Sequence, residues 1–405
     1  NLFLNQLSLN PVYNLGHSYF DVPIDYFKKE EAYIHTALTY LNRKKSEREN
    51  PFEIQIQGSD SLRPNIILVF LESMSNSMLS RYHPDLRTTP FIDSLAKEGI
   101  VFDNFFSAGV HTHNGIISTF YGLPAVMNNK PMNEFSTANM IFYGMPWILK
   151  EKEYQNTFYV TGSKQFDNMN DFLLLNGFDE VIGERDYPKD SIYNSWGVTD
   201  KVMYNRVLDD CDSLFVAEKR FFKSILTISA HEGYTVPKEY QNRLSNTEQP
   251  YDTYELSDLF FGEFMHAAKE KIWFDETVFV IVGDHGQNFS TSYDLNLNYH
   301  TVPLILYAPK YFQHFEYNNP GLQQDIYPTL FSLLDFSYTN NGLGINLLSH
   351  KRDFGYFSAD TKLGVIDNEF FLIYRNQKKI SLFNLQRDPT KDIYPDFQSK
   401  VTEMM

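Results

Sequence analysis

The 405-residue sequence contains a single cysteine, Cys211, so it cannot form an intrachain disulfide. This excludes a scaffold stapled by disulfides, although it leaves the cellular compartment open. Basic charge is also scarce, because 35 Lys and Arg stand against 51 Asp and Glu, which gives a net charge of −16. That balance argues against a nucleic-acid-binding protein and against adhesion to an anionic membrane through a polybasic patch. An acidic protein that handles an anionic substrate needs local positive charge, most simply a metal ion.

Long apolar runs, internal repeats and low-complexity tracts are absent from the sequence. No run reaches the roughly 18 apolar residues that a membrane-spanning helix needs. The chain begins at Asn1 with neither an initiating Met nor a signal peptide, so we interpret it as a fragment or processed form. Aromatic residues are plentiful, with 35 Phe and 27 Tyr, and they are ample for a sizeable core.

The stretch around which the chain is organised is 65–72, N-I-I-L-V-F-L-E. A continuous apolar run without alternation is typical of a strand buried on both faces of a parallel sheet. Further strands are predicted at 100–106, 157–160, 222–229, 277–282 and 302–307, and helices at 90–97, 146–152, 167–176, 199–218, 252–272 and 325–334. This alternation predicts an α/β fold with a mostly parallel central sheet and helices on both faces.

Three regions follow from these patterns. Residues 1–60 are expected to form an approach or linker segment, with a helical pattern over 23–45. Residues 61–345 are expected to form the α/β catalytic domain. Residues 346–405 are expected to form a small antiparallel subdomain, because alternating, turn-rich segments begin near 354.

Ionisable side chains stand at three predicted strand ends: Glu72, His231 and the pair Asp284-His285. The carboxyl ends of parallel strands lie along one edge of a sheet, where ligands bind in open α/β folds, so these side chains can meet there. Together with a Ser or Thr oxygen they suit Zn²⁺ or Mn²⁺. A structural alternative stays open for each residue: Glu72 can pair with a surface cation, Asp284 can cap a helix, and His285 can be a buried hydrogen-bonded imidazole.

Thr112, in A-G-V-H-T-H-N-G, is the candidate nucleophile. A Thr at a helix N-terminus is most often only a cap. The functional alternative places its hydroxyl against a metal, which lowers the hydroxyl pKa while the helix N-terminus favours the resulting negative charge. His231 and His300 are candidates to contact a phosphate or sulfate oxygen or to protonate a leaving alkoxide.

With these residues in view, the chain resembles the alkaline phosphatase/sulfatase superfamily, and within it the extracytoplasmic domain of phosphoglycerol transferases of the lipoteichoic acid synthase type. The order and spacing of several short motifs carry the resemblance. They are N-I-I-L-V-F-L-E-S at 65–73, T-P-F-I-D-S-L-A-K-E-G at 89–99, H-T-H-N-G at 111–115, N-G-F-D at 176–179, W-G-V-T-D at 196–200, T-I-S-A-H at 227–231, V-I-V-G-D-H-G at 280–286, H-T-V-P-L-I-L-Y-A-P at 300–309 and D-I-Y-P-T-L at 325–330.

The resemblance implies that Glu72, Thr112, Asp284 and His285 bind one divalent metal ion, with Thr112 also the nucleophile. Hard oxygen ligands with one imidazole favour Mn²⁺ or Mg²⁺, and Zn²⁺ is also acceptable. The resemblance also implies that His231 and His300 contact the substrate. It further implies transfer of a phosphoglycerol group from a membrane phospholipid to a glycan or glycerol acceptor, by a domain outside the cytoplasm that follows membrane helices missing here.

The sequence departs from this family at one place. Lipoteichoic acid synthases carry a Trp and an Arg that contact the glycerophosphate, whereas 166–169 reads F-D-N-M here, so the Arg is missing. Lys164 and His113 are the candidates to supply the cation.

Three alternatives stay open. A sulfatase of this fold needs a C-x-P-x-R-type motif, which the D-D-C-D-S around Cys211 does not match. A phosphoethanolamine transferase usually carries several disulfides in this domain. A non-catalytic binding module on the same fold usually loses one metal ligand, whereas all four expected ligands are retained.

Overall fold

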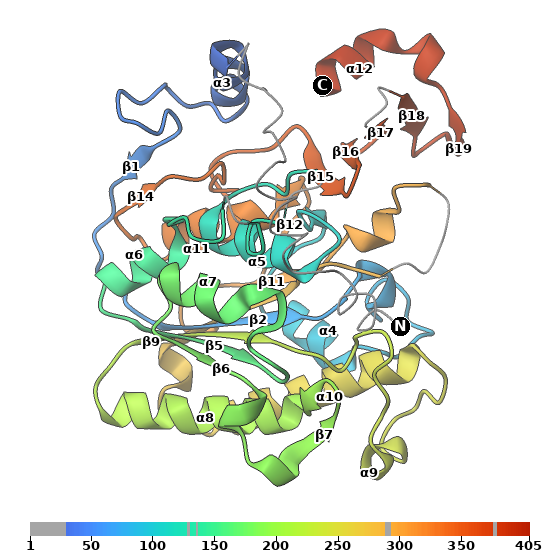
Figure 1. Ribbon diagram of the computed structural model, residues 1–405. Coiled ribbons are helices and arrows are strands. Elements are labelled where there is room, and N and C mark those ends of the chain that lie inside the picture. Colours follow the sequence, from blue (N-terminus) through green and yellow to red (C-terminus); the bar gives the residue numbers. More distant parts are fainter. Residues whose placement is uncertain (1–29, 128–129, 135–136, 288–292, 376–378) are drawn as a thin grey trace, which may run out of the picture.

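A mixed sheet of eight strands forms the centre of the protein, with helices on both faces (Figure 1). The computed structural model describes residues 30–127, 130–134, 137–287, 293–375 and 379–405. The strands follow in the spatial order β12 (Phe315–Tyr317), β3 (Ile100–Phe102), β11 (Leu304–Tyr307), β10 (Thr277–Gly283), β2 (Asn65–Leu71), β9 (Phe221–Leu226), β5 (Gln155–Val160) and β6 (Glu180–Ile182). Strand β11 runs antiparallel to both its neighbours, and the other pairs are parallel. The expected α/β class with a mostly parallel sheet is confirmed.

The pleat of strand β2 divides the core into two layers, because successive side chains of a strand point to opposite faces. Ile66, Leu68 and Phe70 pack on one face. That face carries α5 (Thr112–Tyr121), α6 (Met145–Glu151), α7 (Met169–Leu175) and α11 (Ile326–Leu333). Ile67, Val69 and Leu71 pack on the other face. That face carries α4 (Pro90–Ala96), α8 (Asp200–Val216) and α10 (Tyr251–Lys269). A strand buried on both faces explains why 66–71 is apolar throughout.

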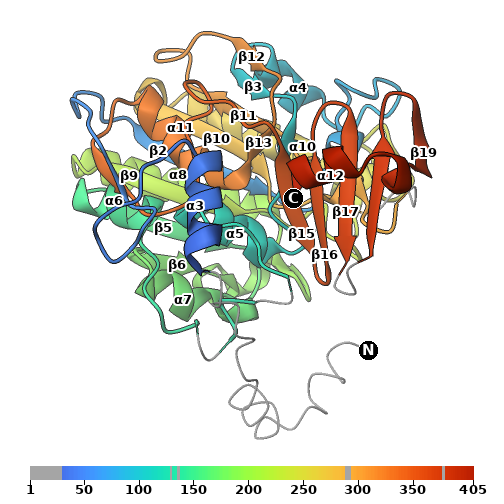
Figure 2. The same cartoon turned by 90° about the horizontal axis from the view of Figure 1, so that it is seen from above.

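The C-terminal part forms an antiparallel sheet that lies to one side of the central sheet (Figure 2). Its strands are β15 (Gly355–Ala359), β16 (Lys362–Ile366), β17 (Phe370–Arg375), β18 (Ile380–Asn384) and β19 (Asp388–Asp392), followed by α12 (Gln398–Met404). The expected small antiparallel sheet is therefore confirmed. It shares an apolar cluster with the α/β part, in which Phe357 and Phe371 pack with Phe106 and Leu322. The boundaries expected at 60/61 and 345/346 stay predictions.

The remaining elements are short. They are α3 (Glu30–Tyr40), α9 (Lys238–Gln241) and three two-stranded pairs, β1 (Ile54–Ile56) with β14 (Tyr338–Asn340), β4 (Phe105–Phe106) with β13 (Gly321–Leu322), and β7 (Ile192–Asn194) with β8 (Gly197–Val198). The first 29 residues of the expected approach segment lie outside the described residues. Within the described ranges, no helix combines the length and apolar character needed to cross a bilayer.

Two of the differences between the predicted and the observed strands bear on the site. The segment predicted as one strand over 100–106 is split at Asp103-Asn104 between β3 and β4, which belong to different sheets. The strand predicted over 222–229 ends at Leu226. The backbone N–H groups of Ile228 and Ser229 donate to the Asp200 carboxylate at 2.8 and 3.0 Å, so they leave the ladder. His231 consequently lies in a turn beyond β9 and not at the strand end itself.

Candidate metal centre and substrate cavity

Strands β2 and β10 bring two carboxylates together through their register. Leu71 pairs with Gly283 at the end of this parallel ladder. The next residue on each strand is Glu72 or Asp284, so the two side chains leave the sheet at adjacent positions on its carboxyl edge. Both are buried, with exposed fractions of 3% and 0%.

His285 completes a cluster of three buried potential ligands. Its Nε2 lies 3.5 Å from Asp284 Oδ2 and 3.9 Å from Glu72 Oε1, and one ligand atom from each residue falls within 4.8 Å of the others. Its Nδ1 lies 2.7 Å from the Gly286 carbonyl oxygen. A carbonyl only accepts hydrogen bonds, so Nδ1 carries the proton and the Nε2 lone pair faces the carboxylates.

The hydrogen bonds around Asp284 fit a cation. Its Oδ1 accepts the backbone N–H groups of Ser73 and His285 at 2.8 and 2.7 Å. Ser73 adopts a left-handed conformation, with φ of 55°, directly after Glu72. Asp284 Oδ2 is buried without a hydrogen-bond partner. A buried acceptor without a donor is costly in a protein interior, and a metal ion would remove that cost.

Burial and the neighbouring charges shift the pKa values of Asp284 and His285. Burial, and then the neighbouring Glu72 carboxylate, raise the pKa of Asp284 to about 7. Burial acts to lower the pKa of His285, but the Asp284 and Glu72 carboxylates outweigh it and raise that pKa. Two buried carboxylates with one imidazole fit a divalent ion with hard or borderline character, such as Mn²⁺, Mg²⁺ or Zn²⁺.

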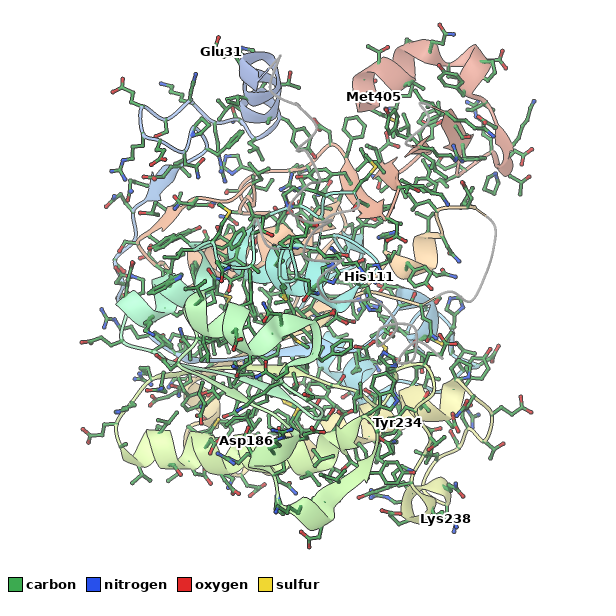
Figure 3. All side chains as sticks on the ribbon, viewed as in Figure 1. Glu31, His111, Asp186, Tyr234, Lys238 and Met405 are labelled. Carbon is green, nitrogen blue, oxygen red and sulfur yellow. The ribbon has the colours of Figure 1, made fainter. Side chains whose placement is uncertain are left out.

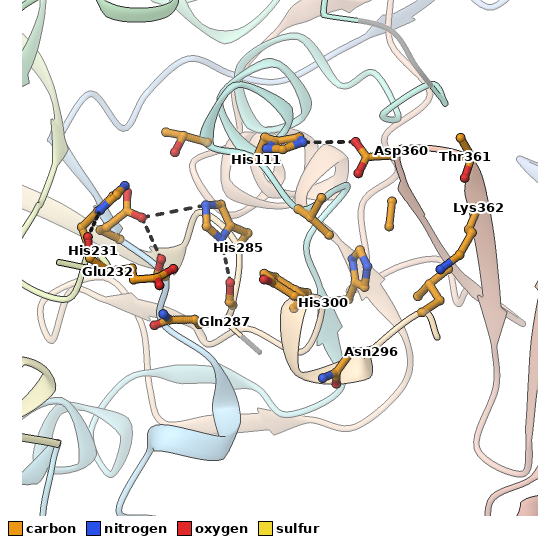
Figure 4. A pocket seen from close by; sticks show the side chains of 18 of the residues that line it. His111, His231, Glu232, His285, Gln287, Asn296, His300, Asp360, Thr361 and Lys362 are labelled. Carbon is orange, nitrogen blue, oxygen red and sulfur yellow. Dashed lines mark hydrogen bonds and ion pairs between the residues drawn. The ribbon is translucent and has the colours of Figure 1, made fainter. Parts of the chain in front are cut away.

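Thr112 is the first residue of α5, whose preceding residue His111 caps the helix. Thr112 lines a cavity of about 810 Å³ together with Glu72 and His285 (Figure 4). The first turn of α5 packs directly on the end of β10. At Gly115, an added Cβ would lie only 2.5 Å from the Asp284 carbonyl oxygen. Glycine at this position therefore lets the helix N-terminus approach the carboxylate cluster.

Gln323 links the segment before α5 to the end of β10, and the sequence did not predict this role. Its Oε1 accepts the backbone N–H of Ala108 at 2.8 Å, and its Nε2 donates to the carbonyl oxygens of Gly283 and Asp284 at 2.9 and 2.8 Å. Gln323 is fully buried. It thus fixes the loop that leads to Thr112 against the end of β10. A glutamine two residues before a predicted helix carries no sequence signal for such a role.

Replacing Gln323 with Met should lower kcat more than the matched replacement Gln324→Met. Both glutamines are buried, but Gln324 donates to Leu343 O and Tyr356 Oη instead, away from the Thr112 loop. Each variant leaves buried polar groups unpaired, so each should lose about 1–3 kcal/mol of unfolding free energy. Urea unfolding with steady-state kinetics below both melting temperatures separates the effects. Equal kcat values in the two variants would contradict the positioning role.

His231 and His300 both line the cavity. His231 Nδ1 lies 2.9 Å from the Glu232 carbonyl oxygen, and its ring lies 4.1 Å from the ring of Trp196. His300 stacks on Phe357 at 4.0 Å, and its buried Nε2 has no hydrogen-bond partner. Burial lowers the pKa of His231 and lowers that of His300 to about 3. Both imidazoles are therefore neutral near pH 7 and present acceptor nitrogens.

His300 reaches the cavity for a topological reason. It precedes β11, and β11 runs antiparallel to β10. The beginning of an antiparallel strand lies at the same edge as the ends of its parallel neighbours. A residue before a strand can therefore join residues that follow strands.

The structure does not bring the two expected cation candidates into the large cavity. Lys164 donates to Asp186 Oδ2 and to the Val181 carbonyl oxygen, both at 3.0 Å, and is not part of the lining. His113 is buried, and its Nδ1 lies 3.7 Å from Asp167 Oδ2. It lines a separate cavity of about 330 Å³.

The C-terminal sheet contributes a wall that sequence reasoning missed. The tip between β15 and β16 places Ala359, Asp360, Thr361 and Lys362 in the lining. Asp360 Oδ1 lies 3.3 Å from Nε2 of His111. His111 lies on the side of the core that faces the C-terminal sheet (Figure 3). Turn residues of an antiparallel meander gave no sign of this contact in the sequence.

Cys211 is buried in the α8 layer and is not part of the cavity lining. Burial raises the pKa of its thiol. The cysteine is therefore an inert core residue.

The fold and this site place the protein among known enzymes. The sulfatase family model matches residues 64–336, and the chain belongs to that family. The expected membership of the alkaline phosphatase/sulfatase superfamily, and with it an enzyme family, is confirmed.

Several individual relatives are similar to this chain. Phosphoglycerol transferase I of Salmonella typhi is 24% identical over 238 residues, which cover 55% of this chain and 30% of the relative. The lipoteichoic acid synthase-like protein YvgJ of Bacillus subtilis is 24% identical over 299 residues, which cover 67% and 47%. The chain thus spans less than half the length of these curated relatives.

Solved structures share the fold over nearly the whole chain. An alkaline phosphatase superfamily protein from Vibrio parahaemolyticus has a TM-score of 0.82 at 22% identity and covers 93% of both chains. The lipoteichoic acid synthase LtaP from Listeria monocytogenes has a TM-score of 0.73 at 18% identity and covers 92% of this chain and 95% of its own. At these identities the likeness concerns the fold.

Proposed function

We propose that the protein is a metal-dependent transferase that moves a phosphoglycerol, or a related phospho-alcohol, from a membrane phospholipid to a glycan or glycerol acceptor. The observation that carries this proposal is the cluster of Glu72, Asp284 and His285, with its unpartnered Asp284 Oδ2, in the same cavity as the first residue of α5. The relatives named as phosphoglycerol transferase and lipoteichoic acid synthase-like protein support the choice of substrate class.

Glu72, Asp284, His285 and the Thr112 hydroxyl are the proposed ligands of one divalent ion, Mn²⁺ or Mg²⁺ in preference to Zn²⁺. Such an ion supplies Lewis acidity and lowers the pKa of a bound hydroxyl. The N-terminus of α5 adds to this, because its unpaired N–H groups favour negative charge on Thr112.

The reaction is proposed in two displacements at phosphorus. In the first, a bond forms between Thr112 Oγ1 and phosphorus, and the bond from phosphorus to the lipid oxygen breaks. Diacylglycerol leaves with the proton that Thr112 gave up. In the second, an acceptor hydroxyl attacks the same phosphorus, its proton returns to Thr112, and the free enzyme is restored. His231 and His300 line the same cavity, and their acceptor nitrogens are proposed to receive and return these protons.

This chemistry implies a location. A donor phospholipid lies at a membrane surface, so the domain is proposed to work next to the cell membrane, on its extracytoplasmic side, with attachment through membrane helices of the longer protein. No nucleic-acid partner is proposed, in line with the net charge of −16.

The experiment that tests the proposal compares three donors in the presence of Mn²⁺. These are phosphatidylglycerol, phosphatidylethanolamine and an aryl sulfate, with glycerol as acceptor. Release of diacylglycerol from phosphatidylglycerol alone is the expected result. Preference for phosphatidylethanolamine or turnover of the sulfate ester would replace the proposal with the corresponding alternative. Inactivity toward all three, without any metal-dependent rise in melting temperature, would favour the binding module.

A further inference from the structure

The walls of the 810 Å³ cavity are strongly acidic. The lining carries the carboxylates of Glu72, Asp167, Glu232, Asp294 and Asp360, but Lys362 is its one Lys or Arg among the described residues. A phosphate-bearing substrate that enters such a cavity is repelled except where a cation stands. The position and pairing of Lys362 therefore matter for what the cavity can hold.

Lys362 stands apart from the carboxylate cluster. It is the first residue of β16 and belongs to the C-terminal wall. In Figure 4, His300 lies between His285 and Lys362, so Lys362 faces the cavity from the far side. A cavity of this volume is in the range that holds drug-sized ligands, and it has room for more than one phosphoglycerol group.

Lys362 shares its carboxylate partner, Asp294, with a second cation. Arg375 holds Asp294 with two hydrogen bonds, Nη2 to Oδ1 at 2.6 Å and Nε to Oδ2 at 2.8 Å. Lys362 Nζ lies 3.4 Å from Asp294 Oδ2 and donates to the Asp294 carbonyl oxygen. Two cations thus share the Asp294 carboxylate, and the contact of Lys362 with it is the longer of the two.

Arg375 and Lys362 differ in whether they have an N–H donor left for a group inside the cavity. Arg375 also donates from Nη1 to Ser381 Oγ at 3.1 Å, which fixes the guanidinium inside the C-terminal sheet. The Lys362 ammonium has three N–H donors, and the described residues engage only those that face Asp294. Lys362 therefore retains a donor and a positive charge for a group inside the cavity.

We propose that Lys362 binds a phosphate of the substrate other than the one that reacts at Thr112. This rests on the proposed function, because the reacting phosphorus must lie beside Thr112 and the carboxylate cluster. A second phosphate can come from two sources: an acceptor that already carries a phosphate, or a lipid donor that carries a second one.

The test compares Lys362→Gln with Lys362→Arg and with Lys391→Gln, a matched control at an exposed position on β19 of the same sheet. Acceptors are glycerol and glycerol phosphate, with phosphatidylglycerol as donor. Lys362→Gln should raise KM for glycerol phosphate about 10-fold, the loss of one charge-assisted hydrogen bond, and leave KM for glycerol unchanged. Lys362→Arg should stay near the unsubstituted enzyme, and Lys391→Gln should match it.

A rise in KM confined to a lipid donor with two phosphates, such as a cardiolipin, would assign the phosphate to the donor and support the proposal in that form. Calorimetric binding of glycerol phosphate makes the test independent of turnover. If the enzyme transfers no phosphoglycerol but Lys362→Gln weakens this binding about 10-fold, the proposed function fails while the phosphate site stands. Equal binding and equal KM values in Lys362→Gln and Lys391→Gln would overturn the proposal.

Discussion

Thr112→Ala should abolish turnover of the lipid donor, with a fall in kcat of at least about 10³-fold, because loss of a nucleophile removes the covalent step itself. The fold should survive. Thr112 is the first residue of α5, His111 takes the N-cap position, and none of the described residues hydrogen-bonds the Thr112 hydroxyl. Release of diacylglycerol from phosphatidylglycerol, measured beside the melting temperature, separates lost chemistry from lost folding.

The conservative variant and the trapped intermediate sharpen this result. Thr112→Ser retains a hydroxyl at the same place and should keep measurable turnover. Rapid quenching of the unsubstituted enzyme with lipid, followed by peptide mass spectrometry, should find a phosphoglycerol adduct on Thr112. Full turnover by Thr112→Ala, or an adduct on another residue, would contradict the assignment of Thr112 as the nucleophile. Neither result would bear on the fold or on the carboxylate cluster.

The carboxylate cluster could be predicted from the sequence because it depends on local signals. An apolar run buried on both faces must end where a charge appears, so Glu72 and Asp284 mark the ends of two strands. Parallel pairing then brings such ends to one edge. The pair Leu71–Gly283 shows how closely the two ends are aligned. The position of Thr112 could be predicted for a similar reason, because a Thr before an apolar helical stretch marks a helix start.

The C-terminal wall of the cavity could not be predicted, because its contacts depend on packing between distant segments. Lys362 and Asp360 belong to a hairpin tip, and Asp294 belongs to a connection between strands of the main sheet. Their meeting follows from the apolar cluster that joins the two sheets, and no periodicity in the sequence encodes that docking. Lys164 illustrates the converse, because a lysine near a motif was a reasonable cation until Asp186 proved to be its partner.

Asp284→Asn should remove metal binding and activity together. In the unsubstituted protein, Mn²⁺ at 100 times its dissociation constant adds about 2.7 kcal/mol of unfolding free energy, or about 3 °C of melting temperature for a chain of this length. The variant should show no such gain, because a neutral amide replaces the carboxylate whose Oδ2 faces the cluster. Asp190→Asn, an exposed position, serves as the control and should keep the full gain.

The metal-free proteins give a second readout, whose sign follows from the pKa of Asp284. Burial and the Glu72 carboxylate raise this pKa from its usual 3.8 to about 7 in the folded state. Ionisation is therefore harder in the folded protein than in the unfolded chain, and the resulting destabilisation is absent below about pH 4, grows toward pH 7 and is complete above it. An Asn at this position retains an oxygen to accept from Ser73 and His285 and carries no charge to destabilise the fold.

Metal-free Asp284→Asn should therefore melt at or above the temperature of the unsubstituted protein at pH 8, and the difference between them should shrink as the pH falls to 5. Adding Mn²⁺ at pH 8 should close or invert that difference, because only the carboxylate form gains from the ion. Differential scanning calorimetry at both pH values, with EDTA and with Mn²⁺, measures the four melting temperatures of each protein. A variant that is less stable than the metal-free parent at pH 8, or that still gains from Mn²⁺, would show that Asp284 is a structural carboxylate. A buried carboxylate that destabilises the empty fold and stabilises the loaded one is the thermodynamic signature expected of a residue retained to bind a cation.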